Sequence, residues 1–234
     1  MPKHVLMIVA NPQVSTTVGG PVGLWASELF HPLAAFEKQG YAITIASPDG
    51  GAIAFDAMSD PRDPSQYSAG DTVSLYYIEN RPDIMARLED TPATGDLKLD
   101  TFDAIMVCGG QAPMFQFPTA TGLHALIGEF YRTGKPTAAL CHGTAALLYV
   151  DGGAFVAGKT MTGFADSEED MADSIVGQKV MPFRVEDEAR AKGANFVSGP
   201  AFEPFATQDG NLITGQQQNS GAKTAELVIA ALED

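Results

Sequence analysis

Short, largely apolar runs recur along the chain and alternate with segments of helical periodicity. The clearest runs cover residues 5–10, 41–46, 103–108 and 137–140. Runs of this length with few polar interruptions are typical of strands that are buried on both faces of a parallel sheet. Between them, apolar residues three and four positions apart predict amphipathic helices. The pattern therefore predicts an α/β fold with helices on both faces of a mostly parallel sheet.

The predicted helix nearest the N-terminus follows a loop rich in Gly, Ser, Thr and Pro. Trp25, Leu29, Leu33 and Phe36 recur at helical spacing, and the helix is expected to end at Gly40. Its first turn would lie at the carboxyl edge of the sheet, where ligands bind in open α/β folds. Further along the chain the same signals predict strands over residues 160–162, 194–197 and 212–214, and helices over residues 123–130, 144–149, 166–170, 186–192 and 222–232.

Periodicity weakens between residues 52 and 100. Prolines and aspartates predict a loop over residues 54–66, and only residues 83–88 suggest a short helix. A connection of nearly fifty residues without a sheet element is long for a compact domain. We therefore predict one domain over residues 1–234, with a cap or interface insertion around residues 52–100.

The net charge narrows the range of expected binding partners. The formal net charge is −15, and only 14 lysines and arginines are present. Nucleic acids and anionic membranes require a basic patch, so neither is expected as a partner. No apolar run approaches the length of a membrane span. Two cysteines, Cys108 and Cys141, are too few for a disulfide framework, which favours a reducing compartment and a cytoplasmic location.

Cys141 lies where a predicted strand meets a predicted helix. The apolar residues 137–140 precede it, and the helix begins almost at once after Gly143. A sharp strand-to-helix turn lifts one side chain out of the backbone, and small neighbours leave room for that geometry. The helix N-terminus behind the sulfur favours thiolate over thiol. Cys141 is therefore the candidate nucleophile; the alternative is a buried structural cysteine.

Two further segments carry candidate functional groups. Glu28 lies in the first turn of the helix that begins after Trp25, where a solvated carboxylate favoured by the helix dipole is the alternative. Gly109 and Gly110 end the strand over residues 103–108. Paired glycines let backbone N–H groups approach a ligand closely, as an oxyanion site requires, although a plain tight turn would use the same residues.

The acidic residues that follow Gly163 have a structural explanation of their own, because Asp, Ser and Glu are common in the first turn of a helix. We find no metal-binding constellation. The four histidines, His4, His31, His124 and His142, are scattered, and no His-x-x-x-His pair occurs.

Five segments taken together resemble the ThiJ/PfpI superfamily, and more narrowly its heat-shock-chaperone and glyoxalase III branch, which is related to class I glutamine amidotransferases. The resemblance extends from about Val5 to Leu232 and implies a flavodoxin-like three-layer sandwich. The segments that carry it are Ala-Ser-Pro-Asp-Gly-Gly at 46–51, Val-Cys-Gly-Gly-Gln-Ala-Pro-Met at 107–114, Ala-Leu-Cys-His-Gly at 139–143, Gly-Lys-Thr-Met-Thr-Gly-Phe at 158–164 and Leu-Ile-Thr-Gly-Gln at 212–216.

The resemblance assigns a role to each candidate residue. Cys141 matches the nucleophile, His142 the histidine that follows it, and Glu28 the glutamate that contacts the sulfur. Glu168 matches the acid that orients the histidine, with Asp166 and Glu169 close enough to be confused with it. Gly109 and Gly110 match the backbone oxyanion site, with Trp25 beside the substrate. One departure is Gln-Gln-Gln-Asn-Ser at residues 216–220, where relatives commonly have Asn-Pro-x-Ser after Thr-Gly-Gln.

The implied function is that of a glutathione-independent glyoxalase, which converts methylglyoxal or a related 2-oxoaldehyde to a 2-hydroxy acid through a cysteine hemithioacetal. It needs no external cofactor and no metal, acts on a small-molecule carbonyl substrate, and is expected in a homodimer. Deglycase activity or a role in stress protection is compatible with the same site. Two alternatives stay open. One is a stress chaperone or redox sensor, in which Cys141 oxidises and an apolar dimer surface binds unfolded client proteins; the other is a cysteine amidase or peptidase-like hydrolase.

Overall fold

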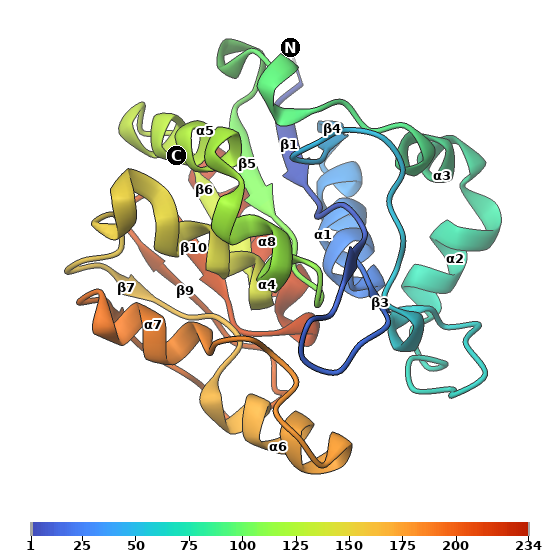
Figure 1. The fold of residues 1–234 in the computed structure, drawn as a ribbon. Coiled ribbons are helices and arrows are strands. Elements are labelled where there is room, and N and C mark those ends of the chain that lie inside the picture. Colours follow the sequence, from blue (N-terminus) through green and yellow to red (C-terminus); the bar gives the residue numbers. More distant parts are fainter. Residues whose placement is uncertain (1, 234) are drawn as a thin grey trace.

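A six-stranded sheet forms the centre of the molecule. The structure, a computed structural model, describes residues 2–233. Four adjacent strand pairs are parallel and one is antiparallel. The mostly parallel sheet is therefore confirmed, and each of the four apolar runs forms one of its strands (Figure 1). Across the sheet the order is β4 (Ala42–Ala46), β1 (His4–Ile8), β5 (Ala104–Val107), β6 (Thr137–Leu140), β10 (Leu212–Gly215) and β9 (Ala206–Asp209).

Helices cover both faces of the sheet, which gives three layers (Figure 1). Successive residues of a strand face opposite sides. Accordingly, Val5 and Met7 belong to one apolar cluster, and Leu6 and Ile8 belong to the other. The first cluster is shared with α1 (Ala26–Lys38) and α8 (Gly221–Glu233), and the second with α5 (Thr121–Arg132) and the 3₁₀ segment η5 (Cys141–Gly153).

An antiparallel hairpin closes one edge of the sheet. β9 and β10 are joined at Gly210, whose φ of +58° lies in the left-handed region that glycine adopts at low cost. The opposite edge is β4, which pairs along its length with β1.

The segment over residues 52–100 contributes no strand to the six-stranded sheet. It forms helix α2 (Thr72–Asn80), which the sequence analysis missed, and α3 (Pro82–Glu89), which confirms the short helix predicted there. α2 packs against α1: the Tyr77 ring stacks on Phe30 at 5.2 Å, and its hydroxyl donates to Glu37 at 2.7 Å. The function of this segment as a cap or interface stays a prediction.

A smaller unit lies beyond η5. Strands β7 (Thr160–Met161) and β8 (Asn195–Phe196) form a separate two-stranded parallel sheet, flanked by α6 (Asp166–Val176) and α7 (Val185–Ala191). Helix α6 projects from the lower end of the molecule in Figure 1. The remaining short elements are β2 (Gln13–Val14), β3 (Pro21–Val22), α4 (Pro113–Gln116) and the 3₁₀ turns Ala57–Ser59, Thr94–Asp96, Leu99–Thr101, Phe117–Thr119 and Gln218–Ser220.

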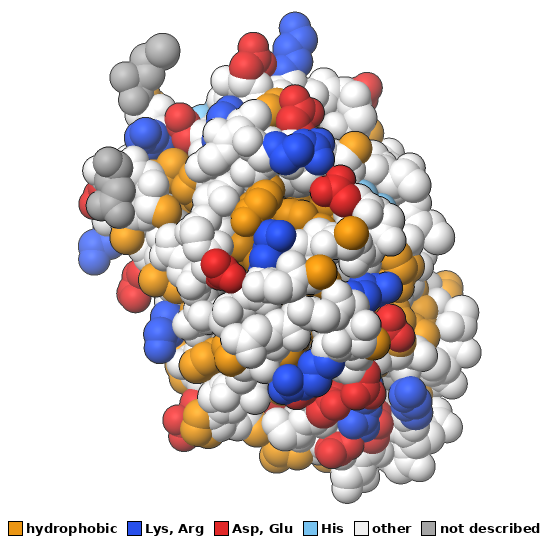
Figure 2. Space-filling view, turned by 90° about the vertical axis from the view of Figure 1, so that its left-hand side faces the viewer, with side chains coloured by type: hydrophobic (Ala, Val, Ile, Leu, Met, Phe, Trp, Pro, Cys, Tyr) orange, Lys and Arg blue, Asp and Glu red, His pale blue; other side chains and the backbone are white. Residues whose placement is uncertain are grey.

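Charged side chains are dispersed on the face shown in Figure 2, where lysines and arginines stand among acidic residues rather than gathered together. That face therefore offers no broad basic surface of the kind that nucleic acids bind. Within residues 2–233, the helices are all too short or too polar to cross a membrane.

Candidate active site

The predicted elbow at Cys141 is present. β6 ends at Leu140, and Cys141 adopts a φ of +53°, in the left-handed region that non-glycine residues seldom occupy. Such a residue costs about 1–3 kcal/mol and persists only where the surrounding structure enforces it. The neighbouring strand end supplies that constraint, because a Cβ on Gly143 would lie 2.6 Å from the carbonyl oxygen of Cys108. Close packing of the two strand ends therefore requires glycine at 143.

Cys141 opens into a cavity of about 440 Å³ at the carboxyl edge of the sheet. The side chains at its base are polar and titratable, and those of its walls are mainly apolar. Of the predicted site residues, the cavity is lined by Cys141, His142, Glu28, Trp25 and Gly110, and also by Glu169. Segments distant in sequence therefore meet here, as predicted for the carboxyl ends of parallel strands.

Glu28 is fully buried in the first turn of α1, so its interpretation as a solvated first-turn carboxylate is wrong. Its Oε2 accepts the backbone N–H of Gly109 at 2.9 Å, and its carboxyl group contacts the Cys141 thiol. Within residues 2–233, Oε1 has no hydrogen-bond partner of good geometry. Burial raises the pKa of Glu28 to about 8, so at neutral pH the carboxyl holds a proton that it can donate.

The environment of the Cys141 sulfur only partly supports the predicted thiolate. Burial raises the pKa of the thiol, and the charge of Glu28 raises it further whenever that carboxyl is ionised. The backbone N–H of His142 acts in the opposite direction. The helix end is therefore not sufficient to hold a thiolate in the closed site. A nearby base must take the thiol proton during attack.

His142 is placed to be that base. Its Nδ1 lies 3.8 Å from the Cys141 sulfur, and its Nε2 lies 3.0 Å from Oε1 of Glu169. Because an ionised carboxylate only accepts hydrogen bonds, this contact places the ring hydrogen on Nε2 and leaves Nδ1 as an acceptor facing the sulfur. The ring also packs against Phe164, with 4.3 Å between centroids. Cys141, His142 and Glu169 thus have the arrangement of a candidate nucleophile, base and orienting acid.

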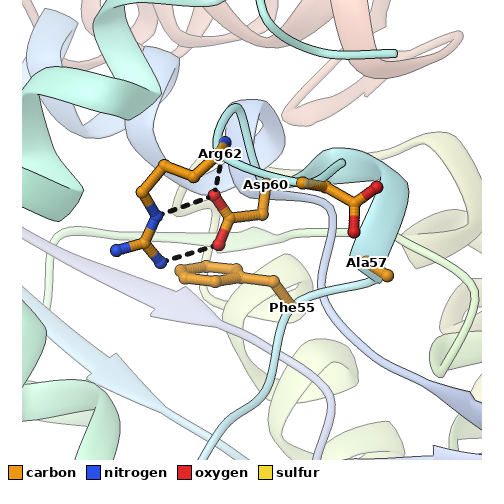
Figure 3. Close-up of a pocket in the computed structure, with 5 residues that line it drawn as sticks. Phe55, Ala57, Asp60 and Arg62 are labelled. Atoms are coloured by element: carbon orange, nitrogen blue, oxygen red, sulfur yellow. Dashed lines mark hydrogen bonds and ion pairs between the residues drawn. The ribbon is translucent and has the colours of Figure 1, made fainter. Parts of the chain in front are cut away.

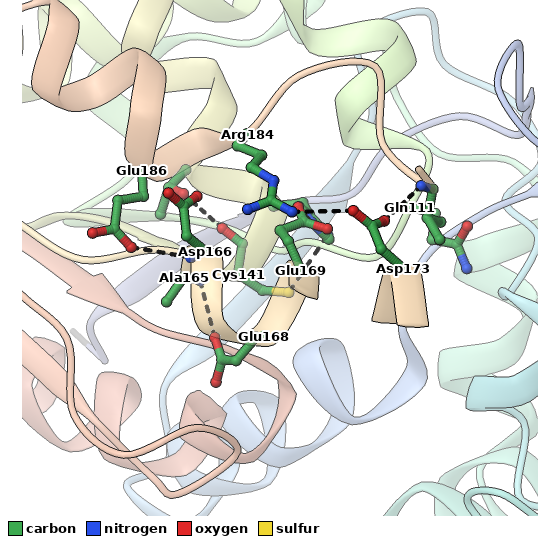
Figure 4. Close-up of polar contacts among 12 residues, drawn as sticks. Gln111, Cys141, Ala165, Asp166, Glu168, Glu169, Asp173, Arg184 and Glu186 are labelled. Atoms are coloured by element: carbon green, nitrogen blue, oxygen red, sulfur yellow. Dashed lines mark hydrogen bonds and ion pairs between the residues drawn. The ribbon is translucent and has the colours of Figure 1, made fainter. Parts of the chain in front are cut away.

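The prediction that Glu168 orients His142 is wrong. Successive residues of a helix point about 100° apart, so only one of two adjacent carboxylates can face the ring. Glu168 instead accepts the N–H of Ala165 and the N–H of Phe202, at 3.0 and 2.8 Å (Figure 4). It also accepts from the side-chain amide of Gln216 at 2.9 Å. Glu168 therefore joins the start of α6 to two other segments.

Asp166, the third acid considered, is also not the partner of His142. Its backbone N–H donates to Glu186 at 3.0 Å, and Arg184 nearby bonds Asp170 and Asp173 (Figure 4). Repulsion from Asp187 and Glu186 adds to burial in raising the pKa of Asp166 to about 6. These contacts belong to the packing of α6 against α7.

One of the two predicted oxyanion glycines is already engaged within the site. The N–H of Gly109 is occupied by Glu28, which corrects the assignment of that group to a substrate oxygen. Gly110 lines the cavity with a φ of +106°, and a Cβ there would lie 2.5 Å from the carbonyl oxygen of Gly23. Trp25 lines the cavity, and its ring meets Tyr67 edge-on at 5.9 Å. Its role beside a substrate stays a prediction.

The sequence analysis missed two aromatic residues of the cavity. Tyr67 comes from the loop after β4, and Phe202 comes from the connection between β8 and β9. Phe202 also has a left-handed backbone, with φ of +58°, and its ring meets Phe164 at 6.2 Å. Neither residue belongs to a periodic segment, so no pattern in the sequence marked it.

A second hollow of about 510 Å³ lies apart from these groups. Its lining includes Phe55, Ala57, Asp60 and Arg62 (Figure 3). The Arg62 guanidinium is engaged by both carboxylate oxygens of Asp60, at 3.0 and 2.7 Å. The hollow has neither a nucleophile nor a base of the kind found beside Cys141.

A model of the DJ-1/PfpI family matches residues 23–231, which include every candidate site residue named above. The chain belongs to the DJ-1/PfpI family. The resemblance inferred from the five sequence segments, which names the same family as ThiJ/PfpI, is thereby confirmed.

Relatives in this family span the whole chain. Glyoxalase 3 of Candida albicans is 28% identical over 240 residues, covering 100% of this chain and 99% of the relative. The glutathione-independent glyoxalase HSP31 of Saccharomyces cerevisiae is 28% identical over 242 residues, with the same coverage. The crystal structure of glyoxalase III from Candida albicans superposes with a TM-score of 0.82 at 26% identity, covering 98% of this chain and 97% of the other.

This DJ-1/PfpI member departs from the expected family pattern at residues 216–220, and the structure shows what these residues contact. Gln216 is buried and bonds Glu168 and Gly199. Gln218 lines the cavity. Gln216 still belongs to the matching Thr-Gly-Gln, so the departure that follows it affects the cavity wall at Gln218. In residues 2–233 no group of three His, Cys, Asp or Glu side chains is arranged to hold a metal ion.

Proposed function

We propose that this protein is a glutathione-independent glyoxalase that converts a 2-oxoaldehyde such as methylglyoxal to a 2-hydroxy acid. The proposal rests mainly on one arrangement: the Cys141 sulfur lies between a base, His142, and a buried protonated acid, Glu28. An isomerisation that moves protons between adjacent carbons needs both a base and an acid beside the nucleophile. Full-length relatives named as glyoxalases support the same activity.

In the first step the Cys141 sulfur attacks the aldehyde carbon. The thiol proton passes to Nδ1 of His142 and then to the aldehyde oxygen, which gives a neutral hemithioacetal. The backbone N–H of Gly110 is the candidate donor to the oxygen while it carries negative charge. Glu169 holds the opposite ring nitrogen of His142 and stabilises the positive charge that the ring gains for a moment.

In the second step hydrogen moves from the aldehyde carbon to the ketone carbon. His142 removes the proton of the hemithioacetal carbon while Glu28 protonates the ketone oxygen, which gives an enediol. His142 then protonates the former ketone carbon, and the hydroxyl on the sulfur-bearing carbon returns its proton to Glu28. The product is a 2-hydroxy thioester, in which one carbon has been oxidised and its neighbour reduced. Water hydrolyses the thioester and releases the acid and the thiol, so no redox cofactor takes part.

A direct test is turnover of methylglyoxal in D₂O without glutathione, followed by NMR. We expect lactate that carries deuterium at C2, because the proton on His142 exchanges with solvent before it reaches that carbon. Added glutathione should leave the rate unchanged, and the variant Cys141→Ser serves as the inactive control. Absence of lactate from the folded wild-type protein would reject the proposal.

The two alternatives use the same cysteine and stay predictions. An amidase would employ Cys141, His142 and Glu169 but gives no role to a protonated Glu28. A chaperone would suppress the aggregation of client proteins even as the variant Cys141→Ala, in which an enzyme would be inactive. The expected homodimer and cytoplasmic location also stay predictions.

A further inference from the structure

The cavity is several times larger than methylglyoxal. Methylglyoxal has five non-hydrogen atoms. Because a water molecule's share of liquid volume is about 30 Å³, methylglyoxal fills on the order of 100–150 Å³. The cavity above Cys141 has a volume of about 440 Å³. Binding sites commonly enclose most of their ligand's surface, so this one has room for a considerably larger substituent.

The unfilled part of the cavity is apolar. We call six of its apolar lining residues the apolar wall: Met58, Tyr67, Ile175, Val176, Met181 and Phe202. They come from the loop after β4, from the end of α6 and its following segment, and from the loop before β9. The same cavity is lined by the polar groups of Cys141, His142 and Glu28, so a bound molecule meets both reactive and apolar side chains.

Much of the apolar wall is exposed to solvent. The exposed fractions are 80% for Ile175, 52% for Tyr67 and 41% for Met58. Large hydrophobic side chains gathered around a catalytic cavity mark a ligand surface, because apolar area left in water is unfavourable. A substrate whose tail reached the mouth would cover them.

The cavity also excludes negatively charged tails. Its lining within residues 2–233 contains no lysine or arginine, whereas Glu28 and Glu169 both contribute to it. Arg184 is engaged by Asp170 and Asp173. A phosphate or carboxylate on the substrate would lose its hydration without gaining a cationic partner.

We propose that the substrate is an uncharged 2-oxoaldehyde whose ketone carbon carries an apolar group larger than methyl, of aryl or branched alkyl size, bound by the apolar wall. This inference rests on the proposed function and specifies its substrate class. The reaction is the isomerisation and hydrolysis described above, with the apolar group carried unchanged into the 2-hydroxy acid.

The kinetic test compares phenylglyoxal with methylglyoxal in the absence of glutathione. We expect kcat/KM for phenylglyoxal to be at least about tenfold higher, mainly through a lower KM, since each added apolar group in a fitted pocket is worth roughly 10-fold or more. Methylglyoxal turnover with no preference for phenylglyoxal would overturn the inference and leave the glyoxalase activity standing.

Two variants locate the preference on the apolar wall. Tyr67→Ser and Ile175→Ser should each lower the ratio of kcat/KM for phenylglyoxal to kcat/KM for methylglyoxal about three- to tenfold, mainly through a higher KM for phenylglyoxal. Tyr76→Ser is the matched control, because Tyr76 is also 52% exposed but lies on α2 and does not line this cavity. Equal effects of Tyr67→Ser on both aldehydes would contradict the inference.

A binding measurement separates this inference from the proposed function. Acetophenone and acetone resemble the two substrates but cannot be isomerised. The assay measures how well each ketone protects Cys141 from alkylation by iodoacetamide, and mass spectrometry quantifies the alkylated protein. We expect acetophenone to protect at a concentration at least about tenfold below that of acetone. Equal protection overturns the apolar wall as a selective surface. Preferential protection by acetophenone, with neither aldehyde turned over, supports that selectivity and rejects the glyoxalase activity.

Discussion

The ends of two adjacent parallel strands each carry a cysteine, and the two cysteines have different surroundings. Cys108 directly follows β5 and is packed in the apolar cluster beneath α1. Cys141 follows β6, adopts a left-handed backbone and opens into the cavity. Burial raises the pKa of both thiols. A cysteine at the carboxyl edge of a sheet is therefore not enough for a nucleophile; the turn of the backbone and the adjacent base distinguish the two.

The largest predicted effect tests this contrast directly. Cys141→Ser should reduce kcat/KM by at least about 10³-fold, because serine has no comparable nucleophilic anion at neutral pH. Cys108→Ala should retain activity within about threefold and lower the free energy of unfolding by about 1 kcal/mol through a small cavity. Steady-state kinetics and urea unfolding measure the two quantities. Loss of activity in stable Cys108→Ala would show that the strand ends share the chemistry.

Glu28 connects the two strand ends, since it accepts from Gly109 and contacts the Cys141 thiol. Glu28→Gln keeps a hydrogen-bond donor toward the sulfur but removes the proton that must move between carbons. We expect it to form the hemithioacetal yet lose turnover by roughly 10²-fold or more. Adduct formation is followed by mass spectrometry and hydroxy-acid production by NMR. Near-normal production would leave His142 as the only proton carrier.

Glu168 and Glu169, the adjacent carboxylates of α6, allow a second comparison, because only Glu169 contacts His142. Glu169→Gln removes the acid that orients His142, and we expect turnover to fall about 10- to 100-fold with little change in stability. Glu168→Gln places an amide N–H₂ among groups that donate to the carboxylate, so the free energy of unfolding should fall by about 1–3 kcal/mol. Kinetics and thermal unfolding of both variants provide the test. The reverse pattern would restore Glu168 as the orienting acid.

The last predicted effect is a dependence on pH that also originates at Glu28. Burial raises its pKa from 4.5 to about 8, and the protonated form is the active acid, so turnover should fall as pH rises through about 8. The same pKa shift makes the free energy of unfolding decrease as pH rises. The folded state keeps a proton that the unfolded chain releases above about pH 4.5, so the free energy of unfolding should decline between pH 4.5 and 8. Both slopes should be reduced in Glu28→Gln, as measured by pH–rate profiles and by thermal unfolding.

The elements predicted best are those whose own residues show the pattern of a strand or helix. β1, β5 and β6 are buried on both faces, and a strand in that position is apolar at nearly every residue. Helix α2 has a local start signal, because the Asp71 side chain caps it by accepting the N–H of Ser74. It was missed because the packing of Tyr77 on Phe30 is a tertiary contact. Local periodicity does not record such contacts.

The residues of the candidate site also fall into two groups, those that the sequence could identify and those that depend on packing. Cys141 and Glu28 could be predicted because their segments match the family's motifs. The choice between Glu168 and Glu169 depends on the rotation of α6 about its own axis, which packing determines and residue spacing does not. Tyr67 could not be predicted, because its place at the cavity depends on the path of a loop.

The left-handed backbone of Cys141 lowers the stability of the fold, so selection for stability and selection for activity favour different residues at position 141. Glycine occupies that conformation without the penalty, which is about 1–2 kcal/mol for other residues. Selection for stability alone would therefore favour glycine over alanine at position 141 in any lineage that no longer needed the reaction. Inactive descendants of such an enzyme should accumulate glycine at the elbow, and retention of the strained cysteine in a relative indicates that its sulfur is still in use.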